Sequence, residues 1–264
     1  MEKVQFRCRG PCSCGRVCSV PRSLLGHRIS CPYSGQVIPV PASPPGEDEW
    51  RKGADPQEML SALPAGVSTR KQRLFAVACC RRVSSALSHE LSRVALDLAE
   101  RHADGSVGED ALAAQAQRLR DEYNSRRAAA GGNGNAVCGT DLDAAYQTLL
   151  RAWPESAAAC ARRTGQEAAA QRNLLRCVFG NPFRPVALAP SVLTWNDRLV
   201  VRLAEATYDE RQMPEGTLDN DRLLVLADAL EEAGCSDEDI LGHLRGPGPH
   251  VRGCWSVDLC IGKS

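Results

Sequence analysis

Closely spaced cysteines near the start of the sequence are the residues best suited to bind a metal. Of the 13 cysteines, five lie within the first 31 residues: Cys8, Cys12, Cys14, Cys18 and Cys31. Thiolates hold zinc in tetrahedral structural sites, and zinc supplies folding energy that so small a module cannot obtain from an apolar core. The clustered thiols predict a structural zinc site whose ligands are drawn from Cys8, Cys12, Cys14 and Cys31, with Cys18 as a further candidate. The alternative is a decayed, weakly folded module without metal.

A second polar cluster lies near the other end of the sequence and consists of His250, Arg252, Cys254 and Asp258. A cysteine and a histidine with an aspartate nearby can act as nucleophile and base if the side chains meet in space. Packing of Trp255 and capping by His250 would explain the same residues without chemistry, and we favour that interpretation. Three further histidines are expected to lie singly on helix surfaces or ends: His89, His102 and His243.

Composition and motifs exclude several classes of protein. Basic and acidic residues balance at 32 each, hydrophobic residues make up 43%, and no P-loop, Rossmann glycine set, HExxH or GxSxG pattern occurs. No apolar run approaches the roughly 20 residues of a membrane-spanning helix, and none resembles a secretory signal at the start. With an odd number of cysteines, these features predict a protein of the reducing cytoplasm, without a membrane partner.

The elements that must position these residues fall into two modules. We predict a small module at residues 1–41, a proline-rich linker at 42–48 and a larger body at 49–264. Residues 1–46 carry six basic side chains and one acidic side chain, so the rest of the neutral chain is net acidic. The basic surface allows salt-dependent nucleic-acid binding, but the module lacks a run of aromatic residues for base stacking.

Periodicity predicts β-structure in the first module and α-helices in the body. Short β-type runs separated by glycine and proline turns occur at Val4–Phe6, Val17–Val20, Arg28–Ser30 and Gln36–Val40. After Asp55 the apolar residues recur with a helical period, and we predict an all-α helical bundle or solenoid-like body. The main helical stripes lie at Arg70–Leu87, Leu91–Leu98, Leu112–Tyr123, Leu142–Trp153, Ala170–Cys177, Leu199–Ala204, Leu223–Leu230, Ile240–Leu244 and Val251–Ile261. Pro185 and Pro190 predict an irregular stretch between two of them.

The first module resembles a small zinc-ribbon module found at the front of planctomycete proteins. The matching residues are Phe6, Cys8, Cys14-Gly15, Val20-Pro21, Gly26, Cys31-Pro32 and Gly35. Ser34 stands where the ribbon pattern has its fourth cysteine, so the module is a degenerate ribbon. The resemblance implies a zinc-binding β scaffold.

The body resembles a large family of planctomycete helical proteins of uncharacterised function. The matching stretches are Arg73–Arg82, Leu175–Pro185, Leu193–Asp197 and Leu223–Trp255. The part from Leu224 to Gly234 is also similar to a short repeat-companion domain from the same bacteria. The resemblance implies a fold and a lineage, but no activity.

These observations favour a non-catalytic cytoplasmic protein that acts through an unknown protein partner or as a regulator. Nucleic-acid binding by the basic first module is the first alternative. An enzyme that uses His250, Cys254 and Asp258 is the second. Because only the first module is expected to depend on metal, chelation is predicted to unfold residues 1–40 and to leave the helical body intact.

Overall fold

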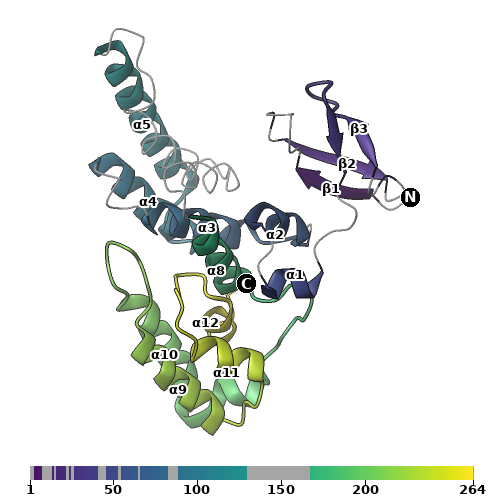
Figure 1. The fold of residues 1–264 in the computed structure, drawn as a ribbon. Helices are drawn as coiled ribbons and strands as arrows, with labels where there is room; N and C mark the ends of the chain where they lie inside the picture. Colours follow the sequence, from purple (N-terminus) through teal and green to yellow (C-terminus); the bar gives the residue numbers. More distant parts are fainter. Residues whose placement is uncertain are drawn as a thin grey trace. The chain divides into compact units, whose positions relative to one another are not determined.

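The computed structural model describes residues 3–7, 14, 16–21, 24, 27–40, 46–52, 55–64, 66–82, 89–129 and 167–263. The helix predicted over Leu142–Trp153 lies outside these residues. The chain divides into two compact units, one formed by Met1–Ala65 with Asn181–Phe183 and the other by Gly66–Gly180 with Arg184–Ser264. Figure 1 shows the elements of both units.

The first unit begins with two antiparallel hairpins. Strand β1 (Lys3–Arg7) pairs with β2 (Val17–Pro21), and β3 (Arg28–Ser30) pairs with β4 (Val37–Pro39). The four strands therefore lie where the β-type runs predicted them. A small core joins the hairpins and consists of Cys18, Val20, Cys31, Ile38 and Val40.

Two short helices complete the first unit. Helix α1 (Glu47–Lys52) buries Trp50, and α2 (Pro56–Ala62) buries Met59. Proline is favoured in the first turn of a helix because its missing N–H has no intrahelical partner there. The carbonyl of Asp55 accepts from the N–H groups of Glu58 and Met59, which fixes the start of α2.

The second unit is helical and is built around α3 (Thr69–Arg82), in which every residue from Arg73 to Arg81 is buried. A helix buried on all sides lies in the centre of its domain. The other helices of this unit are α4 (Glu90–Ala103), α5 (Glu109–Ala129), α8 (Glu167–Phe179), α9 (Pro190–Asp209), α10 (Asn220–Glu232), α11 (Glu238–Leu244) and α12 (Trp255–Cys260). Helix α3 packs against α4 and α8, α4 packs against α5, and α9 packs against α10 and α12 (Figure 1).

The described residues are mainly helical, as predicted, and their strands are confined to the first unit. Within the described part of the second unit, β-structure is limited to isolated bridges that join Thr217 to Gln212 and Val251. None of the described helices is both long enough and apolar enough to cross a membrane.

The expectation of an irregular stretch after Pro190 is wrong, because α9 begins at that residue. Proline occupies the first helical turn, where its ring is compatible with the helix. The helix is interrupted instead at Trp195–Arg198, where Asn196, Asp197 and Arg198 have φ values of 45°, 60° and 61°. Non-glycine residues rarely adopt this left-handed conformation. Because these residues depart from helical φ and ψ values, α9 has a kink here.

A buried ion-pair network joins α3, α4 and the segment that follows α9. Glu100 is 5% exposed and accepts hydrogen bonds from Arg81 Nε at 3.1 Å and from Arg211 Nη1 at 2.8 Å. Arg81 also pairs with Asp97, whose side chain is 56% exposed. One carboxylate in the interior thus compensates two guanidinium groups, which makes Glu100 the centre of the network.

Candidate metal centre

Four metal-binding side chains converge in the second unit: Cys177, His243, His250 and Cys254. One ligand atom from each lies within 4.8 Å of the corresponding atoms of the others. His243 is half-buried and the other three residues are buried. Two thiolates and two imidazoles form the ligand set of many tetrahedral zinc sites. The cluster therefore could hold a metal ion.

Helix α8 brings Cys177 to the cluster because its C-terminal end approaches Trp255 very closely. The helix ends at Phe179 and is followed by Gly180, whose φ is +64°. A Cβ atom at this glycine would lie 3.0 Å from the indole ring of Trp255. Glycine therefore permits both the left-handed turn and the contact that places Cys177 beside Cys254.

Helix α11 positions His243 by burying the apolar side chains next to it. Ile240, Leu241 and Leu244 are buried, and Asp237 caps the helix by accepting from the N–H of Ile240 at 3.0 Å. The imidazole of His243 lies edge-on to that of His250, with ring centroids 4.7 Å apart. Its Nε2 atom lies 3.3 Å from Cys254 Sγ. The packed face of α11 thus directs His243 at the thiol.

The two ring nitrogens of His250 differ in a way that suits a metal ligand. Nε2 lies 3.2 Å from the carbonyl oxygen of Gly246, and a proton on Nε2 would leave the lone pair on Nδ1. Nδ1 is buried and lacks a hydrogen-bond partner of ordinary geometry among the described residues. A buried polar atom without a partner is costly. A metal ion would satisfy this nitrogen, while Gly246 would fix the orientation of the ring.

The two thiols of the cluster have opposite acid–base character. Burial opposes ionisation of Cys254, but its contacts with Cys177 and His243 outweigh that effect and hold its pKa well below the usual value. Burial and the neighbouring Cys254 raise the pKa of Cys177 well above its usual value. Ionisation is therefore easier at Cys254 than at Cys177, and a metal ion bound by both sulfurs would require both thiols to lose their protons.

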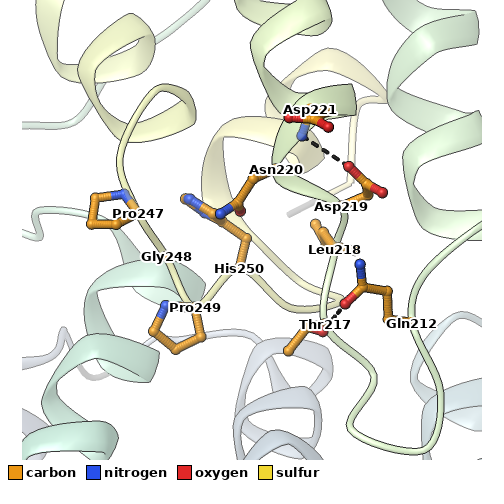
Figure 2. Close-up of a pocket in the computed structure, with 10 residues that line it drawn as sticks. All are labelled: Gln212, Thr217, Leu218, Asp219, Asn220, Asp221, Pro247, Gly248, Pro249 and His250. Atoms are coloured by element: carbon orange, nitrogen blue, oxygen red, sulfur yellow. Dashed lines mark hydrogen bonds between the residues drawn. The ribbon is translucent and has the colours of Figure 1, made fainter.

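A surface pocket of about 520 Å³ adjoins the centre (Figure 2). Its walls are formed by Gln212, residues 217–221 and residues 247–250, so His250 contributes both to the pocket and to the cluster. The carboxylate of Asp219 in this wall caps α10 by accepting from the N–H of Asp221 at 2.8 Å. Asp219 thus has a structural role in the wall.

The thiols predicted as zinc ligands in the first module are described only in part. Cys14 Sγ lies 3.6 Å from Cys31 Sγ, and Cys18 is buried in the adjacent core. Cys8 and Cys12 lie outside the described residues. The structure therefore brings two of the four predicted ligands together, and the complete set stays a prediction.

The second predicted cluster separates into two sites. His250 and Cys254 belong to the metal centre. Arg252 instead donates from Nε to Asp104 at 2.5 Å, and Asp258 accepts from Arg70 Nη1 at 2.7 Å. These last two residues belong to a neighbouring ion-pair network, which lies between α3, α4, α9 and α12.

The expectation that His243 lies singly at a helix end is wrong, because it contacts Cys254 and His250. The close spacing of His243, His250 and Cys254 could have indicated a shared site, because these residues lie within one short segment of the sequence. Cys177 lies far from them in the sequence. Its position on the apolar stripe of a helix is typical of a packed cysteine, and only tertiary contacts bring it to the others.

The ion-pair networks predict a loss of stability in acid. Burial opposes ionisation of Glu100 and Asp104, but hydrogen bonds and charges of Arg211 and Arg81 on the first, and of Arg252 and Arg70 on the second, lower both pKa values. The unfolded values are about 4.3 and 3.9. Their contribution is therefore present above those values and is lost as the pH falls through the lower pKa values of the folded state.

We expect the free energy of unfolding to fall as the pH drops below about 4. Denaturant titrations at a series of pH values, with a chelator present throughout, would measure this without a contribution from metal loss. The Glu100→Gln variant should show a weaker pH dependence in the same range. A wild-type profile that is flat between neutral and strongly acidic pH would contradict the expectation.

The described residues thus define a mainly helical protein with a buried Cys2His2 cluster that could hold a metal ion. Comparison of the chain with protein-family models, with curated proteins and with solved structures found no match.

Proposed function

We propose that this chain is a structural zinc-binding protein that acts through macromolecular contacts. The observation that carries the proposal is the convergence of Cys177, His243, His250 and Cys254, whose ligand atoms lie within 4.8 Å of one another. Thiolate and imidazole ligands favour zinc over magnesium or calcium, which prefer oxygen. Zinc is also the metal for which a four-coordinate tetrahedral site of this composition is common.

The composition of the site supports a structural role over a catalytic one. Structural zinc sites are closed by four protein ligands, whereas catalytic sites keep a position open for water or substrate. All four ligands here are side chains of the chain, and three of them are buried. A Cys254 sulfur bound to zinc shares its charge with the metal and is a weaker nucleophile than a free thiolate. Asp258 is engaged by Arg70 and Tyr208. These features weigh against the enzyme alternative.

A closed metal site fixes the shape of a surface, which suits a protein that binds other proteins. Leu224 and Val225 lie next to each other on α10 and are 41% and 54% exposed. Contiguous exposed apolar patches are typical of protein-binding surfaces, and these two neighbouring residues supply a small patch on α10. The role in partner binding and the cytoplasmic location stay proposals.

Zinc analysis of purified full-length variants tests the site. We expect Cys254→Ser to contain one zinc ion fewer per chain than the wild type, because a neutral hydroxyl is a poor replacement for thiolate. Cys260→Ala is the matched control. Cys260 is also buried and donates to Ser256 O, but it is not part of the cluster. This variant should keep the wild-type zinc content.

The difference between variants, rather than the total zinc content, is the decisive quantity, because the first module also carries thiols. Mass spectrometry of metal content after dialysis against metal-free buffer provides the measurement. Equal zinc content in the wild type, Cys254→Ser and Cys260→Ala would overturn the proposal.

A further inference from the structure

A single buried lysine connects the backbone next to both cysteines of the metal centre. Lys71 lies on α3, and its Nζ atom donates to the carbonyl of Val178 at 3.1 Å and to the carbonyl of Gly253 at 2.8 Å. Val178 directly follows Cys177, and Gly253 directly precedes Cys254. The ammonium group therefore bridges the two chain segments that carry the sulfur ligands.

The charge of Lys71 is compensated by a carboxylate. An ion pair places Nζ 2.5 Å from Asp258 Oδ2, in addition to its hydrogen bonds to the two carbonyls. Burial of a charge is costly unless it is paired and hydrogen-bonded. A group compensated in this way has a fixed position, and it can therefore fix the positions of the carbonyls that it contacts.

The segment that carries Cys254 is held from a second side as well. Tyr208 accepts from the N–H of Gly253 at 3.1 Å and donates to Asp258 Oδ1 at 2.7 Å. Gly253 has a φ of +92°, and a Cβ atom there would lie 2.9 Å from Leu74 Cδ1. The backbone before Cys254 is thus pressed against α3, the helix that carries Lys71.

We propose that Lys71 is a positioning residue for the metal centre, which sets the distance between the Cys177 and Cys254 sulfurs by holding Val178 and Gly253 on one ammonium group. The inference rests on the proposed zinc site and adds an outer-sphere residue to it. Residues in this position orient the ligands and raise metal affinity without contacting the metal.

Arg70 provides a matched control on the same helix. It is a partly buried cation that also pairs with Asp258, through Nη1 at 2.7 Å, and with Asp104 through Nε at 2.9 Å. These contacts of Arg70 are to carboxylates, whereas Lys71 reaches the two carbonyls beside the cysteines. Either substitution leaves Asp258 with a remaining cation. The two variants therefore differ mainly in whether the cysteine-bearing segments are held together.

The test measures zinc affinity and thermal stability of full-length Lys71→Met and Arg70→Met side by side. Competition with a chromogenic chelator gives the affinity, and the absorption spectrum of the cobalt-substituted protein reports the ligand geometry. We expect Lys71→Met to weaken zinc binding by about 10- to 100-fold and to alter the cobalt spectrum. Arg70→Met should lower the thermal midpoint while the zinc affinity and the cobalt spectrum stay those of the wild type.

Equal zinc affinities and cobalt spectra in Lys71→Met and the wild type would overturn the inference about Lys71. This outcome would leave the proposed zinc site unaffected. A wild-type protein that does not bind zinc through Cys254 would instead overturn the proposed function. If Lys71→Met does not fold, Lys71→Arg decides the matter, because its longer, planar group cannot reproduce the contacts of an ammonium. This variant should also bind zinc more weakly, and wild-type affinity would count against the inference.

Discussion

Removal of zinc should lower the thermal midpoint of the helical unit by about 10 °C. A ligand present at about a thousand times its dissociation constant stabilises the folded state by about 4 kcal/mol. In a domain of about 150–250 residues, each kcal/mol shifts the midpoint by about 2–4 °C. The ligands come from α8, α11, the segment between α11 and α12, and the residue that precedes α12, so the loss should affect the helical signal.

Circular dichroism during heating, with and without chelator, measures this effect in the full-length protein. The sequence alone predicted that chelation would unfold only residues 1–40, whereas a metal centre in the second unit predicts a loss of helical stability. The double variant Cys177→Ala with Cys254→Ser is the control, and its midpoint should not respond to the chelator. An unchanged wild-type midpoint would contradict the prediction.

Replacement of Glu100 by glutamine should destabilise the protein by about 3 kcal/mol. The substitution keeps the shape of the side chain but removes the charge that compensates Arg81 and Arg211. Loss of one partner from a buried ion pair is costly because the other charge stays buried. Denaturant titration at neutral pH, with the metal content held constant, would measure the change in the free energy of unfolding.

Asp97→Asn is the matched control for this prediction. Asp97 pairs with the same guanidinium of Arg81, but its side chain is 56% exposed, whereas that of Glu100 is 6% exposed. Ion pairs at the surface contribute about 0–1 kcal/mol, so the control variant should unfold almost like the wild type. Similar losses in both variants would show that burial does not determine the strength of this network.

The fold was predicted well in segments whose apolar residues recur with the period of a strand or of a helix. The strands at Val17–Pro21 and Arg28–Ser30 and the buried helix α3 follow from local patterns of apolar residues. The start of α9 was missed because proline ends a helix in the interior but is accepted in the first turn, and local sequence does not distinguish the two positions. The kink at Asn196 occurs without glycine, and no sequence pattern predicted it.

Two of the four residues in the candidate site were predicted from the sequence. His250 and Cys254 were candidates because they lie four residues apart, and the structure places both in the cluster that could hold a metal ion. Arg252 and Asp258 share the same segment but contact Asp104 and Arg70. Cys177 could not be assigned from sequence, since its approach depends on how the end of α8 packs against Trp255. Tertiary proximity, rather than spacing, selects the ligands.

If zinc fills the site, the wide separation of Cys177 from the other three residues in the sequence would link the stability of the protein to the zinc supply of the cell. Because the cluster forms only when α8 and the later segment have packed, metal binding and folding of this unit would then be one equilibrium. Each tenfold fall in free zinc then removes about 1.4 kcal/mol of stability as long as the free concentration stays well above the dissociation constant. Losses of this size change the fraction of chains that cellular proteases can degrade. The abundance of the protein would then follow zinc availability without any dedicated sensor.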